Sequence, residues 1–393
     1  MPQPAAAITA MPASGIRTIT NLALALPGII RLEIGEPNFP TPQHIVEAAH
    51  RAAQDGFTRY THTQGLLSLR EAWSERLALV NGRETEPDQI IVTAGAVAGL
   101  HATFAAILAP GEEILIPDPG WPNWGMIAAL IGACTVGYPC VAGQGWQPAL
   151  DRLDALVTPR TRAILVNSPG NPTGAVLGRA ALEAFAAFAE RHDLWLVSDE
   201  CYDAIVFDGE HLGTAAVASA ERTVTIASCS KTYAMTGWRM GCVAAPERLT
   251  PAIVKVQQAT QASVCTVAQK AAEAALTGSQ DCVAEMRAFY RARRDQAVVL
   301  LADLGRPIAS PEGAFYAMVD LSDAVEDDAA FAHYLLVNRG VAVAPGSAFG
   351  PAGSGSVRIA LCVSQEALAS GLPRLIEAAN VAIQAPSPAR NGR

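Results

Sequence analysis

The 393-residue chain has little charge, few aromatic residues and no excess of positive charge. Charged residues make up 17% of it and aromatic residues 6%, and the formal net charge is −9 at pH 7. Because non-specific binding of nucleic acid depends on a basic surface, we expect no nucleic-acid partner. No uninterrupted apolar run approaches the roughly 20 residues that a membrane-spanning helix needs, so we expect no membrane partner either.

Cysteine is present, but in no arrangement that is typical of a metal site. The eight cysteines are scattered, and none forms a Cys-x-x-Cys pair. The common zinc sites need such spacing, so we expect no metal. Scattered thiols in a large, core-rich chain are typical of a reducing compartment, and the start MPQPAAAITAMPASG lacks the basic region of a signal peptide. We therefore expect a cytoplasmic protein.

What the chain does contain is an alternation of helix-like and strand-like segments. Apolar residues recur at helical spacing in the segments 43–56, 65–82, 96–108 and 181–193. Short apolar runs typical of strands lie within 89–95, 112–120, 161–174, 193–202 and 222–231. Such alternation predicts βαβ units, and hence an α/β fold with a mostly parallel sheet that helices cover on both faces.

The pattern changes near residue 275. A long charged helix is expected over 284–304, followed by shorter strands at 313–320, 341–346 and 356–361. We therefore expect a large domain over residues 42–274 and a smaller α+β domain over 275–393. The N-terminal segment 1–41 is expected to pack with the small domain.

Polar and reactive groups follow the predicted strands of the large domain. They are Gly95, Ala96 and Val97, then Asn167 and Asn171, then Asp199 and Tyr202, and finally Lys231. Ligands of open α/β sheets bind outside the carboxyl ends of the strands. We therefore expect these groups to surround one ligand.

One end of that ligand is expected to be a phosphate. The turn that begins at Gly95 opens a helix, whose N–H groups and dipole favour an anion. Ser228, Ser230 and Arg239 would add donors to the same anion. Burying a carboxylate at the end of a strand costs free energy unless a cation or hydrogen-bond donors pair with it. We therefore expect Asp199 to bind a protonated nitrogen of the ligand.

The remaining groups suit an aromatic aldehyde. Asn171 and Tyr202 could donate to a phenolate oxygen, and Trp121 could lie flat on an aromatic ring. Lys231, desolvated near Arg239, could have a lowered pKa and act as a nucleophilic amine. Pyridoxal 5′-phosphate has the phosphate, the pyridine nitrogen, the phenolic oxygen and the aldehyde that these groups suit, and it is our hypothesis for the cofactor.

The chain also resembles a known family over nearly its whole length, the class I/II aminotransferases among the fold-type I pyridoxal-phosphate enzymes. The similar stretches, in order, are LEIGEPNFPTP, YTHTQGLLSLREA, VTAGAVAGL, PDPGWPNW, NSPGNPTG, VSDECYDAIVF, SCSKTYAMTGWRMG and VRIAL. A single motif such as NPTG is weak evidence, but the order and the spacing together are specific. The resemblance implies a large domain with a mostly parallel sheet of the seven-stranded type.

The resemblance also implies roles for individual residues. Lys231 would carry the cofactor as a Schiff base, Asp199 would hold the pyridinium N–H, and Asn171 and Tyr202 would hydrogen-bond the ring oxygen. The phosphate would be bound by Gly95, Ala96, Val97, Ser228, Ser230 and Arg239.

Three further residues have implied roles at the edge of the site. Tyr60 resembles the tyrosine that reaches the phosphate of the neighbouring subunit, which implies a homodimer with shared active sites. Arg358 resembles the arginine that grips the substrate α-carboxylate with its planar fork. Gly35 would let the backbone approach the same carboxylate closely.

The implied activity is a ping-pong transamination between an L-amino acid and a 2-oxo acid, with aspartate, aromatic and alanine-type substrates all open. A β-lyase or a related eliminating enzyme stays an alternative, because a fold does not fix a function. The intact set of Lys231, Asp199, Tyr202, Arg239 and Arg358 argues against a regulatory protein that has lost catalysis. Arg17, Arg59 and His62 lie in segments that could approach the site, but the sequence does not place their side chains.

Overall fold

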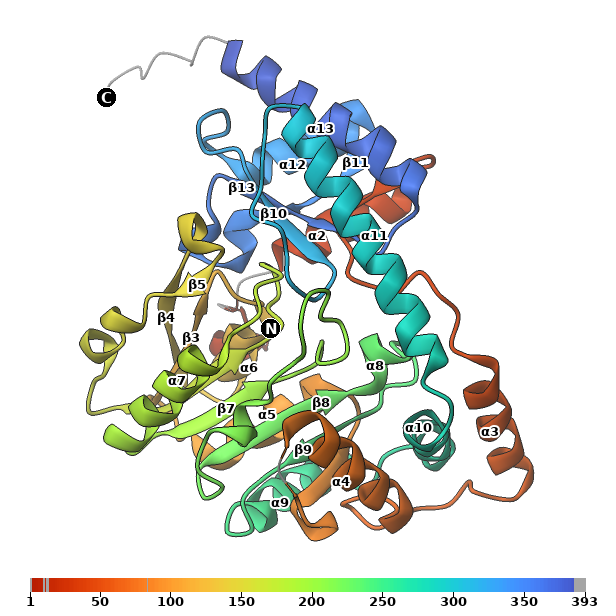
Figure 1. The fold of residues 1–393 in the computed structure, drawn as a ribbon. Helices are drawn as coiled ribbons and strands as arrows, with labels where there is room; N and C mark the ends of the chain where they lie inside the picture. Colours follow the sequence, from red (N-terminus) through yellow and green to blue (C-terminus); the bar gives the residue numbers. More distant parts are fainter. Residues whose placement is uncertain (1, 10, 12–13, 83, 385–393) are drawn as a thin grey trace.

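A computed structural model describes residues 2–9, 11, 14–82 and 84–384 of the chain. Its described residues form a central sheet of eight strands (Figure 1). In spatial order these are β2 (Ile90–Thr93), β9 (Gly241–Ala244), β8 (Thr223–Ser228), β7 (Trp195–Asp199), β6 (Thr161–Asn167), β3 (Glu113–Asp118), β4 (Cys134–Val141) and β5 (Gln147–Pro148).

The sheet is mostly parallel, as predicted. Strand β9 runs antiparallel to both of its neighbours, and the two-residue edge strand β5 runs antiparallel to β4. The other neighbouring strands pair in parallel. Without β5 the sheet has the seven strands that the family resemblance implied.

Helices cover both faces of this sheet, because successive strand residues point to opposite sides. Ile91 enters one core and its neighbours Ile90 and Val92 enter another. The first face is covered by α5 (Ala96–Ile107), α6 (Asn123–Leu130) and α9 (Thr250–Thr260). The second is covered by α4 (Leu67–Asn81), α7 (Arg179–Arg191) and α10 (Thr266–Thr277).

Helix boundaries follow local signals in the sequence. Helix α4 ends at Asn81, and its C-cap Gly82 adopts a left-handed conformation with φ of 63°. Helix α3 (Gln43–Gln54) begins directly after Pro42 and packs against α10. The short α8 (Cys229–Thr232) follows β8, and its N-cap Ser228 accepts a hydrogen bond from the backbone N–H of Ser230.

The C-terminal part forms a second, smaller sheet against long helices (Figure 1). Its elements are α11 (Asp281–Asp303), β10 (Tyr316–Asp320), α12 (Asp328–Arg339), β12 (Ala344–Pro345), β13 (Ser356–Ala360) and α13 (Gln365–Gln384). Strands β10, β13 and β12 form an antiparallel sheet. The strand predicted at 341–346 is two short strands, β12 and β11 (Val341–Ala342).

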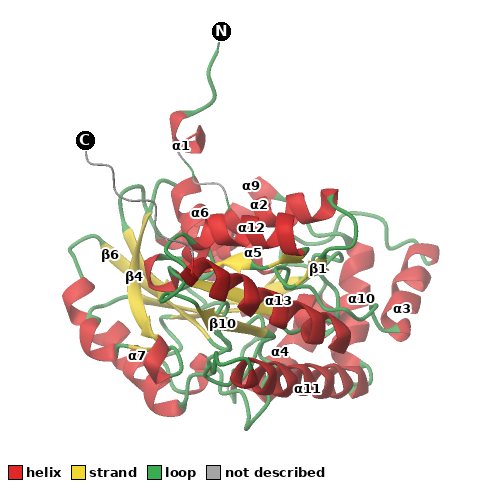
Figure 2. Ribbon diagram, turned by 90° about the horizontal axis from the view of Figure 1, so that it is seen from above, coloured by secondary structure: helices red, strands yellow, loops and turns green. Residues whose placement is uncertain are grey.

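The N-terminal segment lies against this C-terminal part. Strand β1 (Ile30–Arg31) pairs in parallel with β11, and α2 (Gly15–Ala25) packs on α12 and β12. The four-residue α1 (Ala6–Thr9) contacts α6 at the edge of the molecule, and residues 2–5 before it project outward (Figure 2). The division of the chain at 41/42 and 274/275 remains our proposal.

The described residues contain neither a membrane-spanning helix nor a metal-binding cluster. No helix among them is both long and apolar enough to cross a bilayer. No group of three or more histidine, cysteine, aspartate or glutamate side chains within them is placed to hold a metal ion.

Candidate active site

A cavity of about 620 Å³ lies where β2, β6, β7 and β8 end. Eleven predicted site residues line it: Gly35, Ala96, Val97, Trp121, Asn171, Asp199, Tyr202, Ser228, Ser230, Lys231 and Arg239. They come from loops and helix starts that are far apart in the sequence, and the parallel strands bring them to one edge of the sheet.

Lys231 lies on α8, directly after β8. Its Nζ donates to the carbonyl oxygen of Gly35 at 2.7 Å. Burial lowers the pKa of Lys231 below its usual value. A lowered pKa increases the fraction of neutral amine near pH 7, and the neutral amine is the nucleophilic and basic form.

Asp199 ends β7, and its side chain is 3% exposed. Its Oδ2 accepts a hydrogen bond from Trp124 Nε1 at 3.1 Å, and its Oδ1 accepts from the backbone N–H of Cys201 at 3.3 Å. Burial raises the pKa of Asp199, and no described cation forms an ion pair with it. The carboxylate therefore has room for a cationic N–H donor from a ligand.

A hydrogen-bonded set of side chains links the large sheet to the C-terminal part. The hydroxyl of Tyr202 lies 2.9 Å from that of Tyr316, and burial raises the pKa of Tyr202 well above its usual value, so that it stays a neutral donor. Arg358 Nη1 donates to Asn171 Oδ1 at 2.9 Å, which leaves the amide N–H₂ group of Asn171 as a donor toward other partners.

Arg358 itself is held on several sides. Its side chain is 2% exposed, and its Nη2 donates to the carbonyl oxygen of Glu33 at 2.6 Å. The guanidinium lies 4.2 Å from the ring centroid of Tyr316 and 4.8 Å from that of Phe349. Its buried Nε has no hydrogen-bond partner among the described residues. A buried N–H without a partner is costly, and a substrate anion would relieve that cost.

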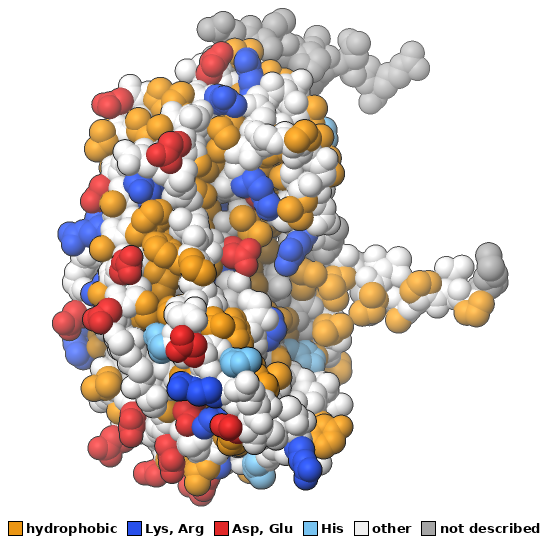
Figure 3. Space-filling view, turned by 90° about the vertical axis from the view of Figure 1, so that its right-hand side faces the viewer, with side chains coloured by type: hydrophobic (Ala, Val, Ile, Leu, Met, Phe, Trp, Pro, Cys, Tyr) orange, Lys and Arg blue, Asp and Glu red, His pale blue; other side chains and the backbone are white. Residues whose placement is uncertain are grey.

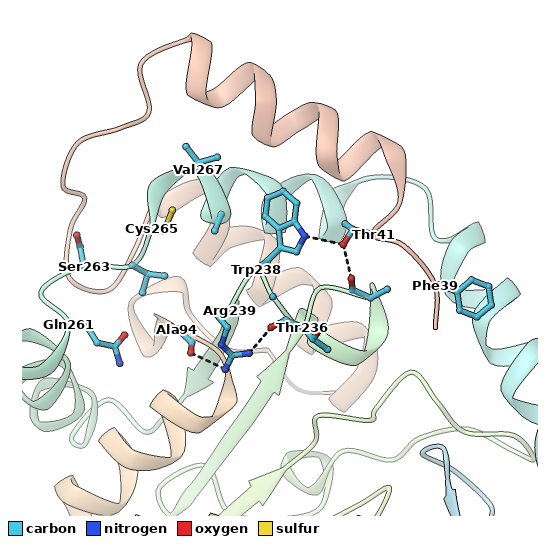
Figure 4. A pocket seen from close by; sticks show the side chains of 14 residues that line it. Phe39, Thr41, Ala94, Thr236, Trp238, Arg239, Gln261, Ser263, Cys265 and Val267 are labelled. Carbon is cyan, nitrogen blue, oxygen red and sulfur yellow. Dashed lines mark hydrogen bonds between the residues drawn. The ribbon is translucent and has the colours of Figure 1, made fainter. Parts of the chain in front are cut away.

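The start of α5 and Arg239 form the anion-binding end of the cavity. Gly95 has φ of 78°, and a Cβ at this position would lie 2.5 Å from Arg239 Nη2, so only glycine fits without displacing the arginine. Arg239 Nη1 donates to the carbonyl oxygen of Thr236 at 2.8 Å, and the guanidinium forms no ion pair with the described residues (Figure 4). The helix start and this guanidinium, which has no carboxylate partner among the described residues, both favour an anion.

The family "Aminotransferase class I and II" matches residues 27–375 of the chain. The chain belongs to this family. It is 39% identical over 369 residues to the aromatic-amino-acid aminotransferase 2 of Thermococcus litoralis, covering 92% of this chain and 94% of the relative. It is 39% identical over 349 residues to the aspartate/prephenate aminotransferase of Thermus thermophilus, covering 88% and 90%.

Solved structures show the same relationship. A single mutant of the Thermus thermophilus aspartate aminotransferase superposes with a TM-score of 0.91 at 37% identity, covering 96% of this chain and 100% of the other. The predicted class I/II aminotransferase is therefore confirmed. Its fold is that of these enzymes, and its activity is the transfer of amino groups.

Three predicted site residues of this aminotransferase do not line the cavity: Gly95, Arg358 and Tyr60. Arg358 lies behind Asn171, to which it is bonded. Tyr60 is 92% exposed and contacts little of its own chain. Of the three residues that the sequence could not place, Arg17 lines the cavity, whereas Arg59 and His62 do not.

Sequence reasoning missed two residues of the site. Trp124 donates to Asp199, a contact that the sequence analysis assigned to no tryptophan. Trp121 and Trp124 lie in one short motif, and only the geometry of α6 decides which indole reaches the strand end. Tyr316 was missed because its contact with Tyr202 depends on how the two parts of the chain pack, which no local pattern encodes.

Proposed function

We propose that this aminotransferase binds pyridoxal 5′-phosphate in the 620 Å³ cavity and works by two half-reactions, between an L-amino acid and a 2-oxo acid. When bound, the cofactor supplies an aldehyde that takes up the amino group and a ring that withdraws electrons from the substrate Cα. One observation carries the proposal. A single cavity contains the amine of Lys231, with its lowered pKa, and the buried carboxylate of Asp199, which has no cationic partner among the described residues.

The residues present fit each part of the cofactor. The N–H groups at Ala96 and Val97, together with Ser228, Ser230 and Arg239, suit the phosphate, with Gly95 keeping the space open for the arginine. Charge-assisted hydrogen bonds are worth roughly 1.5–3 kcal/mol each, so several of them would retain the cofactor between half-reactions.

The opposite end of the cavity fits the ring. Asp199 would accept from the pyridinium N–H, and this ion pair would repay part of the cost of burying the carboxylate. Tyr202 and the amide of Asn171 would donate to the ring oxygen, and Trp121 would lie against the ring. The Trp124 indole, which also lines the cavity, holds Asp199 in place through its hydrogen bond.

Lys231 would transfer the substrate proton, and Arg358 would bind the substrate. In its neutral form Lys231 Nζ can accept the proton of the substrate Cα, as a positioned general base. Arg358 would bind the α-carboxylate through the N–H groups that its contacts to Asn171 and Glu33 leave free, and Gly35 keeps the backbone close.

We further propose a homodimer whose active sites are shared. The phenol of Tyr60 would reach the phosphate in the partner subunit. This would explain why so large a side chain is exposed in its own subunit. A second cavity of about 890 Å³ adjoins the first at Thr236 and Arg239, and the partner would cover it (Figure 4). Residues 2–5 project from the body of the molecule and would contribute to the same interface (Figure 3).

We propose the cytoplasm as the compartment. All eight cysteines are free, which is consistent with a reducing environment. The substrates are an amino acid and a 2-oxo acid. The relatives are named for aspartate, aromatic amino acids and prephenate, so the donor panel should include aspartate, glutamate, phenylalanine, tyrosine and alanine.

The test is a panel of these donors against 2-oxoglutarate and pyruvate, with purified protein saturated with pyridoxal phosphate. Amino-group transfer in at least one pair, abolished in Lys231→Ala, is the expected result. Release of pyruvate and ammonia from a donor without any acceptor would instead indicate an eliminating enzyme. Transfer that persists in Lys231→Ala would refute the role of this lysine.

A further inference from the structure

Tyr316 lies behind the cavity and packs against several of its functional residues. Its side chain is 2% exposed, and it is not among the residues that line the cavity. Its hydroxyl lies 2.9 Å from that of Tyr202, and Cζ of Arg358 lies 4.2 Å from its ring centroid. A Cβ at Gly35 would overlap the same hydroxyl. Tyr316 therefore meets the residues proposed to bind the cofactor ring oxygen and the substrate carboxylate.

The hydroxyl of Tyr316 has one hydrogen-bond partner among the described residues, the hydroxyl of Tyr202. The isolated pair could bond in either direction, because each phenol can both donate and accept. A ligand oxygen in the cavity removes this freedom. Tyr202 has a single hydroxyl proton, so if it donates to the ring oxygen, the proton between the two phenols must come from Tyr316.

The packing around the two phenols fixes their relative position. The rings of Tyr202 and Tyr316 meet edge to face with centroids 5.7 Å apart, and Phe315 lies against Tyr202 with centroids 5.4 Å apart. Tyr316 begins strand β10, where it pairs with Ala360 of β13 in the small sheet. Both side chains are buried, so each hydroxyl is directed at the other by the packing of the small sheet on the large one.

We infer that Tyr316 is a positioning residue, whose O–H donates to the oxygen of Tyr202 and so directs the Tyr202 O–H at the ring oxygen of the cofactor. The inference rests on the proposed function and extends it to a residue outside the cavity. A hydroxyl that accepts one hydrogen bond while it donates another is a stronger donor, because the two bonds polarise each other. Tyr316 thus both orients and strengthens the donor that touches the cofactor.

The titratable groups around Tyr316 keep their protons near neutral pH. Burial raises the pKa of Tyr316 to about 12 and the pKa of Tyr202 well above its usual value. Burial also raises the pKa of the Cys362 thiol to about 12 and the pKa of the Cys201 thiol well above its usual value. Arg358 faces the Tyr316 ring with a charge that does not titrate in this range. A change in visible absorption with pH therefore reports the bound cofactor and not these neighbours.

Tyr316→Phe tests the direction of the hydrogen bond in the holoenzyme. Donation to the ring oxygen favours loss of the proton from the bond between Lys231 and the cofactor, because the oxygen then carries more of the negative charge. Removing the Tyr316 hydroxyl weakens that donation, so the midpoint of the visible pH titration should rise by up to about one pH unit. An unchanged midpoint would overturn the inference. A lower midpoint would also overturn it, since Tyr202 would then be the donor to Tyr316 in the wild type.

A second background shows whether Tyr316 acts through Tyr202. In Tyr202→Phe the further change Tyr316→Phe should leave the midpoint where it is, because the donor that Tyr316 supports is gone. An equal shift in both backgrounds would indicate a general effect of packing and refute the inference. The matched control is Tyr290→Phe. Tyr290 is buried with its ring centroid 5.2 Å from that of Phe315, and its hydroxyl has no hydrogen-bond partner among the described residues, so its loss should not move the midpoint.

Equilibrium binding separates this inference from the proposed function, because it needs no turnover. Tyr316→Phe should weaken the binding of pyridoxal phosphate about two- to tenfold, and should not weaken the binding of an analogue that lacks only the ring hydroxyl. Equal weakening of both compounds would overturn the inference. If titration and binding respond to Tyr316→Phe as expected but the wild type transfers no amino group from any donor, the proposed function is refuted and this inference is supported.

Discussion

The side-chain amine of Lys231 is bonded to the backbone of Gly35, with 2.7 Å between Nζ and the carbonyl oxygen. This contact joins the end of β8 to the N-terminal segment, across 196 positions in the sequence. It matters because Gly35 also lies against Tyr316, where a Cβ would overlap the phenol ring and its hydroxyl. The position of the amine therefore depends on a glycine in another part of the chain.

Gly35→Ala should lower kcat/KM by about 10²-fold or more, since small misplacements of catalytic groups have effects of that size. The physical reason is the overlap of the new methyl group with Tyr316. Because the ring carbons are overlapped as well as the hydroxyl, the double variant with Tyr316→Phe should not recover. Recovery in that double variant, measured by steady-state kinetics, would show that the hydroxyl alone is the obstacle.

Trp124→Phe should weaken the binding of pyridoxal phosphate. The substitution removes the indole N–H that donates to Asp199, and the loss of a hydrogen bond to a carboxylate raises the pKa of that carboxyl further. We expect the dissociation constant to rise up to about tenfold at neutral pH. Trp121→Phe is the matched control, because it retains an aromatic ring and leaves Asp199 untouched; an equal effect in both would contradict the assignment.

Gly95→Ala should reduce the affinity for the phosphate group specifically. The new Cβ would lie 2.5 Å from Arg239 Nη2, and φ of 78° strains any residue other than glycine, at a cost of order 1–3 kcal/mol. Equilibrium binding should show a loss for pyridoxal phosphate and a much smaller loss for pyridoxal, which lacks the phosphate. Equal losses for both compounds would place the phosphate elsewhere.

Lys231→Met should stabilise the cofactor-free protein. Burial lowers the pKa of Lys231 below the 10.5 of a free lysine, so between the folded and unfolded pKa values the unfolded chain binds more protons than the folded chain. Above pH 10.5 the lysine is neutral in both states and does not lower the free energy of unfolding. As the pH falls toward its folded pKa, the unfolded chain takes up the proton first, and the free energy of unfolding decreases. Thermal unfolding should show a higher Tm for the variant at pH 7 and a shrinking difference toward pH 10.5; a lower Tm for the variant at pH 7 would contradict this account.

Hybrid dimers would test the shared active site. Lys231→Ala and Tyr60→Ala in separate chains, mixed and refolded together, should regain part of the wild-type activity, because one site of each hybrid then has both residues intact. When the two substitutions are placed in the same chain and mixed with inactive Lys231→Ala chains, no activity should return. Failure of the first mixture to recover would contradict a role for Tyr60 in the partner subunit.

The sequence predicted those parts of the site that local signals encode. Asp199 ends an apolar strand, and Lys231 and Asn171 lie shortly after the ends of two others. Strands that end at one edge of a sheet bring such residues together without further information. Gly95 follows the same rule, since it lies between a strand and a helix.

What the sequence could not predict depends on contacts between distant segments. Tyr316 meets Tyr202 only once the small sheet is packed on the large one. Arg17 reaches the cavity because α2 packs on β12 and α12, a contact that no spacing in the sequence reveals. Strand β9, only four residues long, was not among the predicted strands, because a run of that length between a loop and a proline carries little periodicity.

The central claim is that Lys231 bonds covalently to pyridoxal phosphate. The chain has only three lysines, Lys231, Lys255 and Lys270, so reduction of the complex with borohydride followed by peptide mass mapping gives an unambiguous site. The account predicts one phosphopyridoxyl group per chain, on Lys231, and none in Lys231→Ala. A label on Lys255 or Lys270, or a wild-type protein that stays unlabelled with excess cofactor, would contradict it.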